Sequence, residues 1–297
     1  MRVLVTGVSG FAGAFVAKTL AKAGLDVVGV HRKDTPFLAA VKQAPICVIR
    51  GDLEQATALP GPFDAIVHAA ATSPMPGVRA AQIVRDNVNA TLALIRAAEN
   101  WRSRAFVFFS SVSRYGEITA PVLDETTPIT NPDLYGSTKY IGEQLLAGRS
   151  DILSGLALYL PGILGPGAHR SWLPRVAARL QASQPIEAYN LDMPFNNAAH
   201  ISDVASLVLN ALRRGWHGFD AIVLGAHGTL PIRDVIETLA RGIGVSARII
   251  ERPPTKSSFL LSSKRAIERW DYKPMAIEHL LKRYSVEVIE GGYHLEI

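Results

Sequence analysis

A tyrosine and a lysine four residues apart, Tyr135 and Lys139, are the side chains whose spacing most directly indicates chemistry. The preceding Asn131-Pro132-Asp133 is typical of a helix start, so both side chains are expected on one helical face. A phenol with a pKa of about 10 is a weak base, but a nearby ammonium favours the phenolate and lowers that pKa. Tyr135 would then exchange a proton with a substrate hydroxyl or carbonyl. The alternative is an ordinary pair on a solvated helix, because this short pattern often arises by chance.

A hydroxyl group, Ser111, ends the apolar run 106–110, which is typical of a buried strand. Ligands of open α/β sheets gather beyond the carboxyl ends of the strands, so Ser111 is placed to hydrogen-bond a substrate oxygen. The alternative is a serine that caps a turn.

Three spaced glycines near the start of the chain predict a binding site for a pyrophosphate. Gly7 allows a sharp turn off the strand 2–6, Gly10 removes a Cβ where phosphates come close, and Gly13 lets the next helix pack tightly. That helix, expected over 11–23, points its free N–H groups and positive dipole end at the phosphates. The predicted ligand is a dinucleotide.

These residues are positioned by alternating apolar runs and helical patterns. Strands are predicted at 2–6, 26–30, 46–49, 65–68, 105–110 and 155–160, with helices near 11–23, 78–100 and 135–148. The nearly continuous hydrophobicity of the strands indicates burial on both faces, as in a parallel sheet. The fold class is therefore predicted as α/β, a Rossmann-type doubly wound parallel sheet with a smaller C-terminal α/β substrate lobe. The dinucleotide-binding domain is expected to span 1–166 and to be joined by 196–225, with 167–195 and 226–297 forming the lobe.

Composition limits the classes of protein that remain. The chain has 297 residues, 48% of them hydrophobic, which is enough for a large core. A net charge of +5 without a dense basic block does not suggest nucleic-acid binding. No long apolar run or leader pattern is present, so a soluble cytoplasmic protein without a membrane partner is expected. The single cysteine, Cys47, is expected to be a buried thiol, and the histidines are not spaced as a metal site.

In combination, these motifs resemble the extended branch of the short-chain dehydrogenase/reductase superfamily, the NAD-dependent epimerase/dehydratase family that includes the nucleotide-sugar 4-epimerases. The matching segments occur in order over nearly the whole chain: T-G-x-x-G-x-x-G at 6–13, Gly51-Asp52-Leu53, His68-Ala69-Ala70-Ala71, 86–91, Ser110-Ser111, Tyr115-Gly116, Tyr135 with Lys139, 161–166, 200–205 and 263–274.

The resemblance implies a catalytic set in which Ser111 holds the reacting oxygen, Tyr135 is the acid/base, and Lys139 tunes it while binding the nicotinamide ribose. It implies a coenzyme site made by Gly7, Gly10, Phe11, Ala12, Gly13, His31, Arg32, Asp52, Leu53, Ala69, Ala70, Ala71, Asn87, Tyr135, Lys139, Leu160 and Pro161. The expected substrate contacts are Ser73, Ser111, Gly162 and Asn196.

The chain departs from the family pattern at the end of the second strand. NAD-preferring relatives present an acidic residue there, whereas this chain has His31-Arg32-Lys33. An arginine pairs with a 2′-phosphate in bidentate fashion, so NADP is favoured over NAD. NAD stays open, because Arg32 and Lys33 are also typical of ordinary loop cations.

Other departures concern the substrate. Val112 and Ser113 stand where the 4,6-dehydratases carry an Asp-Glu pair, and neither shuttles a proton as a carboxyl group does, which argues against dehydration. Asn196 stands where UDP-sugar 4-epimerases often have an arginine, and Gly162 replaces an asparagine that many relatives use near the substrate. Both differences weaken the case for a UDP-sugar.

The predicted function is an NAD(P)-dependent oxidoreductase or epimerase that transfers hydride at a carbonyl or alcohol of a sugar, in particular a nucleotide-linked sugar. It would act as a 4-epimerase or as a keto-sugar reductase. The alternative is a regulatory protein that binds NAD(P) without turnover. A homodimer is expected through the helices near 78–100 and 135–148, with Ala90, Leu94, Ala97 and Ala98 on its face, unless that periodicity reflects packing on the sheet.

Overall fold

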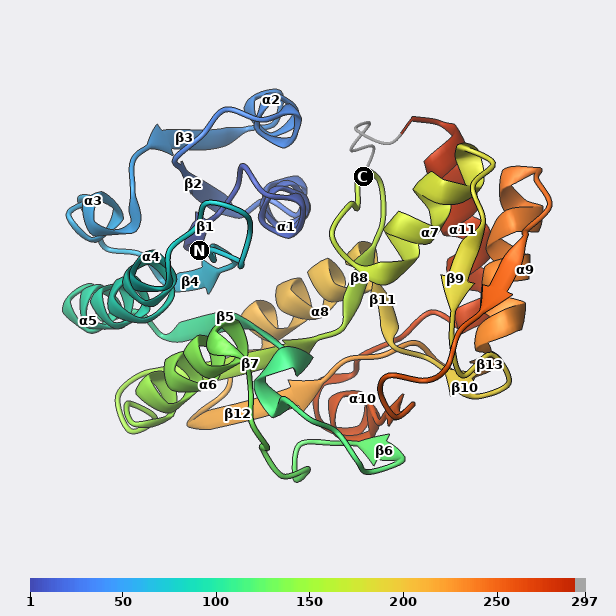
Figure 1. Ribbon diagram of the computed structural model, residues 1–297. Coiled ribbons are helices and arrows are strands. Elements are labelled where there is room, and N and C mark those ends of the chain that lie inside the picture. Colours follow the sequence, from blue (N-terminus) through green and yellow to red (C-terminus); the bar gives the residue numbers. More distant parts are fainter. Residues whose placement is uncertain (292–297) are drawn as a thin grey trace.

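A computed structural model describes residues 1–291 of the chain. Its strands and helices alternate through the first 160 residues, as the apolar runs predict (Figure 1). The strands of the central sheet are β1 (Arg2–Thr6), β2 (Asp26–His31), β3 (Ile46–Arg50), β4 (Ala65–His68), β5 (Ala105–Ser111), β7 (Ser154–Leu160) and β12 (Phe219–Val223). The helices that accompany them are α1 (Phe11–Lys22), α2 (Pro36–Lys42), α3 (Leu53–Thr57), α4 (Ala80–Val84), α5 (Ala90–Asn100), α6 (Leu134–Ala147) and α8 (Ile201–Arg214).

The central sheet is parallel throughout, with the strand order β12-β7-β5-β4-β1-β2-β3. The order reverses direction between β1 and β4, and ligands of open α/β sheets bind at such a reversal. The carboxyl ends of the strands lie at one edge of the sheet, since Thr6 pairs with His68, and Ser111 pairs with Leu160. The Rossmann-type α/β fold is confirmed.

Two apolar clusters sandwich the sheet, because successive side chains of each strand point to opposite faces. Val3 and Val5 of β1 pack with α1, α2 and α8 on one face, whereas Leu4 packs with α5 and α6 on the other. The inner strands are thus buried on both sides, which explains their nearly continuous hydrophobicity.

The later part of the chain builds a third apolar cluster between α7 (Trp172–Gln181), α9 (Ile232–Ile243) and α11 (Ile277–Ile289), grouped together in Figure 1. Short strands accompany it: β8 (Gly162–Leu164), β9 (Ile186–Ala188), β10 (Pro194–Phe195), β11 (Ala198–His200), β13 (Leu230–Pro231) and β14 (Ile249–Glu251). Two more, β6 (Val122–Leu123) and β15 (Leu260–Leu261), pair with each other. The helix α10 (Lys264–Trp270) instead returns to the sheet, where Trp270 joins the first cluster. The exact domain boundaries stay a prediction.

The helix expected over 78–100 is interrupted. Between α4 and α5 the backbone forms a π-helical turn, η1 (Arg85–Asn89), in which Asp86 and Asn87 are both buried. Wider π-turns of this kind are frequent at functional sites. On α5, Leu94 and Ala98 are fully buried in the second cluster, so they pack within this chain.

The expectation that Cys47 is a buried thiol is wrong: the residue is exposed. β3 is an edge strand, so alternate residues of its apolar run face outward.

The described residues contain neither a membrane-spanning helix nor a cluster of metal ligands. None of the helices within 1–291 has the length and apolarity needed to span a membrane. Over this range, no three His, Cys, Asp or Glu side chains gather as a metal site.

Candidate functional site

The glycine turn after β1 forms a backbone cradle at the start of α1. Gly7 has a φ of +76°, which a side chain rarely tolerates, and Gly10 caps the helix while its N–H donates to the Gly7 carbonyl at 2.8 Å. A Cβ on Gly13 would collide with that same carbonyl oxygen. Phe11 and Ala12 begin α1, whose unpaired N–H groups therefore face this turn.

The segment after β4 lies against the cradle. A Cβ on Gly7 would stand 2.9 Å from the backbone of Ala70, and the Ala70 N–H donates to Thr6 Oγ1 at 3.3 Å. Beneath it, the ring of His68 hydrogen-bonds Thr6 at 2.7 Å. Burial lowers the pKa of His68 to about 3, so this histidine is neutral and serves as a spacer. Ala69 and Ala70 therefore line the side of the cradle, and Ala71 follows them in the chain.

The other predicted coenzyme residues lie at the same edge of the sheet. His31 ends β2 and is buried, and its ring contacts the Lys33 carbonyl at 3.3 Å. Asp52 follows β3 and caps α3 through Gln55 at 2.8 Å, so its carboxylate is used locally, and Leu53 begins that helix. Leu160 ends β7 and precedes Pro161.

Asn87 joins this edge to the helix that carries Tyr135. Its side chain accepts from the Thr72 N–H at 2.8 Å and donates to Thr138 at 3.1 Å. Thr138 in turn donates to the Tyr135 carbonyl at 2.8 Å. The buried amide of Asn87 therefore fixes the loop after β4 against α6.

Tyr135 and Lys139 share one face of α6, as their spacing predicts. Asp133 caps the helix by accepting from the Gly136 N–H at 2.7 Å. The Lys139 ammonium lies 5.7 Å from the centre of the Tyr135 ring and donates to the Phe109 carbonyl at 2.7 Å. Burial lowers the pKa of Lys139 to about 8, although the nearby Glu143 carboxylate opposes that shift.

The pKa of Tyr135 differs from the expectation. Burial raises it above its ordinary value, and the groups that oppose this shift are the Arg170 guanidinium and the Ser73 hydroxyl. The expected lowering by Lys139 is therefore wrong for the protein without ligands, because removal of the phenol from water outweighs the nearby charges.

Ser111 lies next to the start of α6. Its hydroxyl accepts from the Ser113 N–H at 3.1 Å and caps the short helix η2 (Val112–Tyr115). A Cβ on Gly136 would collide with the Ser113 carbonyl, so the residue after Tyr135 packs directly on this turn. The turn that Ser111 caps and the helical turn that carries Tyr135 are therefore in contact.

The predicted substrate residues fall into two groups. Ser73 accepts from Arg170 at 3.5 Å beside Tyr135, and Gly162 begins β8 where a Cβ would approach Ser171 within 3.0 Å. Asn196, by contrast, is buried, and its amide bonds both backbone groups of Leu261 at 2.8 and 2.9 Å. That pairing holds β15 in place and gives no support to a substrate contact by Asn196.

Two buried residues beneath the site escaped the sequence analysis. Glu143 lies one turn after Lys139, forms an ion pair with Arg114 at 2.7 Å, and accepts a hydrogen bond from Ser110. The guanidinium of Arg114 stacks over three tyrosine rings, 4.6 Å from the centre of Tyr115, 5.0 Å from Tyr140 and 4.5 Å from Tyr159. The i+4 spacing of Lys139 and Glu143 was the available signal.

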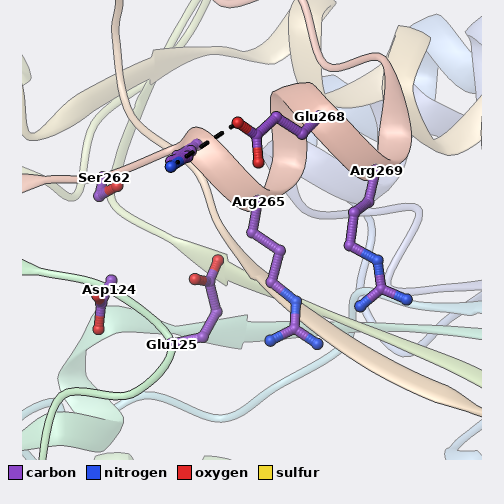
Figure 2. A pocket seen from close by; sticks show the side chains of 7 residues that line it. Asp124, Glu125, Ser262, Arg265, Glu268 and Arg269 are labelled. Atoms are coloured by element: carbon purple, nitrogen blue, oxygen red, sulfur yellow. Dashed lines mark ion pairs between the residues drawn. The ribbon is translucent and has the colours of Figure 1, made fainter.

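A separate cavity of about 360 Å³ lies beside the edge strand β12 and is lined by both acidic and basic side chains (Figure 2). Arg265 and Arg269 project from α10 and pair with Asp220 of β12, while Glu125 accepts from the Val223 N–H at 2.8 Å. The two arginines are thus paired within the chain and Glu125 is bound to the backbone, and the cavity lies apart from the site above. Its lining residues are Asp124, Glu125, Ser262, Lys264, Arg265, Glu268 and Arg269.

Solved structures share this architecture over nearly the whole chain. The UDP-glucuronic acid 4-epimerase of Bacillus cereus in complex with NAD superposes with a TM-score of 0.82 at 21% identity, covering 100% of both chains. The Bordetella bronchiseptica enzyme WbmG in complex with NAD gives a TM-score of 0.84 at 19% identity, covering 99% of this chain and 95% of the other. At these identities the likeness shows the fold.

Sequence relatives cover different shares of the chain. The UDP-glucose 4-epimerase of Streptomyces lividans is 29% identical over 266 residues, which is 81% of this chain and 80% of that relative. The D-erythronate dehydrogenase of Cupriavidus necator is 33% identical over 181 residues, 55% of each protein. Residues 3–225 match the NAD dependent epimerase/dehydratase family, and the chain belongs to that family.

Proposed function

We propose that the chain is a nicotinamide-dependent enzyme that oxidises or reduces a sugar carbon, in particular that of a nucleotide-linked sugar, as a 4-epimerase or a keto-sugar reductase. One observation carries the proposal. The Tyr135–Lys139 pair stands on a helix that packs against the turn at Ser111, at the same sheet edge as the glycine cradle.

The residues at that edge fit a dinucleotide. The cradle keeps its backbone bare, because a Cβ on Gly7 or Gly13 would overlap neighbouring backbone atoms, and the start of α1 offers free N–H groups to a pyrophosphate. A bound nicotinamide supplies the hydride acceptor and donor, while the protein supplies orientation and proton transfer.

In this proposal Tyr135 holds and moves the proton of the reacting sugar hydroxyl through its phenol oxygen, and Ser111 hydrogen-bonds the same oxygen. Lys139 supplies a buried positive charge 5.7 Å from the ring, fixed by the Phe109 carbonyl. With a pKa of about 8, Lys139 is mostly protonated at pH 7. A substrate that displaces water around Tyr135 strengthens this electrostatic coupling.

The relatives support the substrate class, since those described above include a UDP-glucose 4-epimerase and a UDP-glucuronic acid 4-epimerase. The two solved structures described above are complexes with NAD, which supports a nicotinamide dinucleotide as the coenzyme of this chain. The predicted preference for NADP finds no support among them. That preference depends on Arg32, which directly follows β2.

The test combines ligand analysis and turnover. Purified protein is denatured and its released nucleotide identified, and interconversion of UDP-glucose and UDP-galactose is then measured with and without added coenzyme. Tightly held NAD with interconversion supports the epimerase, whereas consumption of added reduced coenzyme supports the reductase. Binding of a dinucleotide without turnover on any sugar nucleotide would favour the non-catalytic alternative.

The central variant is Tyr135→Phe, which should retain dinucleotide binding but lower turnover at least about a hundredfold, the usual scale of acid/base catalysis. Tyr284→Phe is the matched control, because it removes the hydroxyl of a buried tyrosine on α11, outside the proposed site. Unchanged turnover in Tyr135→Phe would refute the mechanism.

The homodimer and the cytoplasmic location expected from the sequence belong to this proposal as well. Val84 on α4 and Ile141 on α6 are exposed apolar side chains on helices that contact each other, which supports a dimer face there. Light scattering of the purified protein and cell fractionation test the two expectations.

A further inference from the structure

Arg32, the cation on which the NADP preference was based, is already engaged by a carboxylate. Its Nη1 lies 2.8 Å from Asp86 Oδ2, and its Nη2 donates to Thr72 Oγ1 at 3.2 Å. The two partners are buried, whereas the arginine side chain is 47% exposed. Arg32 and Asp86 are 54 residues apart in the sequence, so only the fold brings them together.

Asp86 is held from several sides. Thr72 Oγ1 donates to the same carboxylate oxygen at 2.7 Å, and Arg85 lies 3.1 Å from the other oxygen. Burial alone would raise the pKa of Asp86, but the hydrogen bonds of Arg32, Thr72 and Arg85 outweigh it and hold the pKa below its ordinary value. Asp86 is therefore a fixed negative charge at neutral pH.

The cluster lies beside the cradle. The Gly7 and Val8 N–H groups both donate to the Val30 carbonyl, at 3.1 and 3.4 Å, and Arg32 follows Val30 by two residues. Thr35 Oγ1 donates to the Ser9 carbonyl at 2.8 Å, which ties the loop after β2 to the cradle. The end of β2 next to the glycine turn is where a dinucleotide places its adenosine ribose.

We propose that Asp86 determines coenzyme choice by occupying Arg32, so that the chain binds NAD in preference to NADP; this rests on the proposed function. A 2′-phosphate that approaches Arg32 also approaches the Asp86 carboxylate, and like charges placed side by side select against the wrong ligand. NAD carries a neutral hydroxyl at that position and meets no such repulsion. The arginine acts as a fixed partner of Asp86 rather than as a free phosphate receptor.

The experiment is a calorimetric titration of the purified protein, freed of bound nucleotide, with NAD and with NADP. Wild type is expected to bind NAD at least about tenfold more tightly. Asp86→Asn keeps the shape and removes the charge, so it should strengthen NADP binding at least about tenfold and change NAD binding by less than about threefold. The double variant Asp86→Asn/Arg32→Ala should lose the NADP gain, because the released arginine is then missing.

Asp34→Asn is the matched control. It removes an exposed carboxylate that lies in the same loop as Arg32 but pairs with Lys42. Its NADP affinity should match wild type within about threefold. Asp86→Ala serves if Asp86→Asn does not fold, because it removes the same charge, and it should strengthen NADP binding to a similar extent. Wild-type preference for NADP, or an unchanged ratio of the NAD and NADP affinities in the Asp86 variants, would each overturn the inference. Absence of binding by either dinucleotide to wild type would instead refute the proposed function and, with it, this inference.

Discussion

The buried ion pair between Arg114 and Glu143 gives a prediction whose size follows from the structure. The two side chains are 6% and 1% exposed and lie 2.7 Å apart. The change Arg114→Met keeps an unbranched apolar side chain but removes the cation. Removing one partner of a buried pair typically destabilises a protein by about 3–5 kcal/mol, because the remaining group must either stay charged without its partner or become neutral.

Part of that loss must depend on pH. Burial raises the pKa of Glu143 to about 7, with Arg114 opposing the rise. The folded protein therefore binds more protons than the unfolded chain between the ordinary carboxyl pKa and 7, and stability falls as pH rises through that window. Without Arg114 the pKa of Glu143 rises further, so the carboxyl stays protonated at pH 8. In the wild-type native state Glu143 ionises at pH 8, one unit above its pKa, and this ionisation stabilises the native state by about 1 kcal/mol. The variant lacks that contribution.

The assay is urea denaturation followed by circular dichroism at pH 5 and pH 8. The loss in Arg114→Met should be about 1 kcal/mol larger at pH 8 than at pH 5, where Glu143 is protonated in both proteins. Adding Glu143→Gln should remove this difference. Arg104→Met is the control, because Arg104 belongs to an exposed pair with Asp64 and should cost less than about 1 kcal/mol at either pH. Equal losses at pH 5 and pH 8 in Arg114→Met would refute the reasoning.

Three further predictions concern other parts of the molecule. Gly13→Ala should weaken dinucleotide binding at least about tenfold and cost about 1–3 kcal/mol, because the new Cβ overlaps the Gly7 carbonyl; calorimetry with NAD and urea denaturation check this, and unchanged binding contradicts it. Lys139→Met should abolish most turnover yet raise the free energy of unfolding at pH 7, because burial lowers the pKa of the ammonium to about 8 and so disfavours its charged form in the folded protein. The gain in urea denaturation should shrink from pH 8 towards pH 10, where the folded protein loses the proton. A variant less stable than wild type at pH 7 would count against the argument. Asp220→Ala should cost about 1–3 kcal/mol in urea denaturation, because it leaves the buried Trp270 indole N–H, now bonded at 2.8 Å, without an acceptor, whereas the two arginines are exposed enough to be hydrated. A loss below about 0.5 kcal/mol would contradict this.

The elements that the sequence predicts well are those whose pattern is local. Runs such as 105–110 are almost entirely apolar because both faces of the sheet are covered. The turn at 7–13 is predictable because its backbone leaves no room for a Cβ at Gly7 or Gly13. The spacing of Tyr135 and Lys139 likewise needs only a helix.

The features that sequence reasoning missed depend on distant segments or on solvent. The exposure of Cys47 follows from the position of β3 at the sheet edge, which no run of four or five residues reveals. The engagement of Arg32 by Asp86 needs the π-turn that directs two consecutive side chains inward. The raised pKa of Tyr135 depends on how completely neighbouring loops cover the phenol, and one of the opposing charges, Arg170, comes from another part of the chain.

The edge strand β12 has a consequence for biosynthesis. It pairs with β7 only after some 60 intervening residues have been made, since β7 ends at Leu160 and β12 begins at Phe219. While the chain leaves the ribosome, β7 therefore waits with unpaired backbone groups, a state that invites association with other nascent chains. A fragment that stops before Phe219 would carry the whole glycine cradle and still be prone to aggregate.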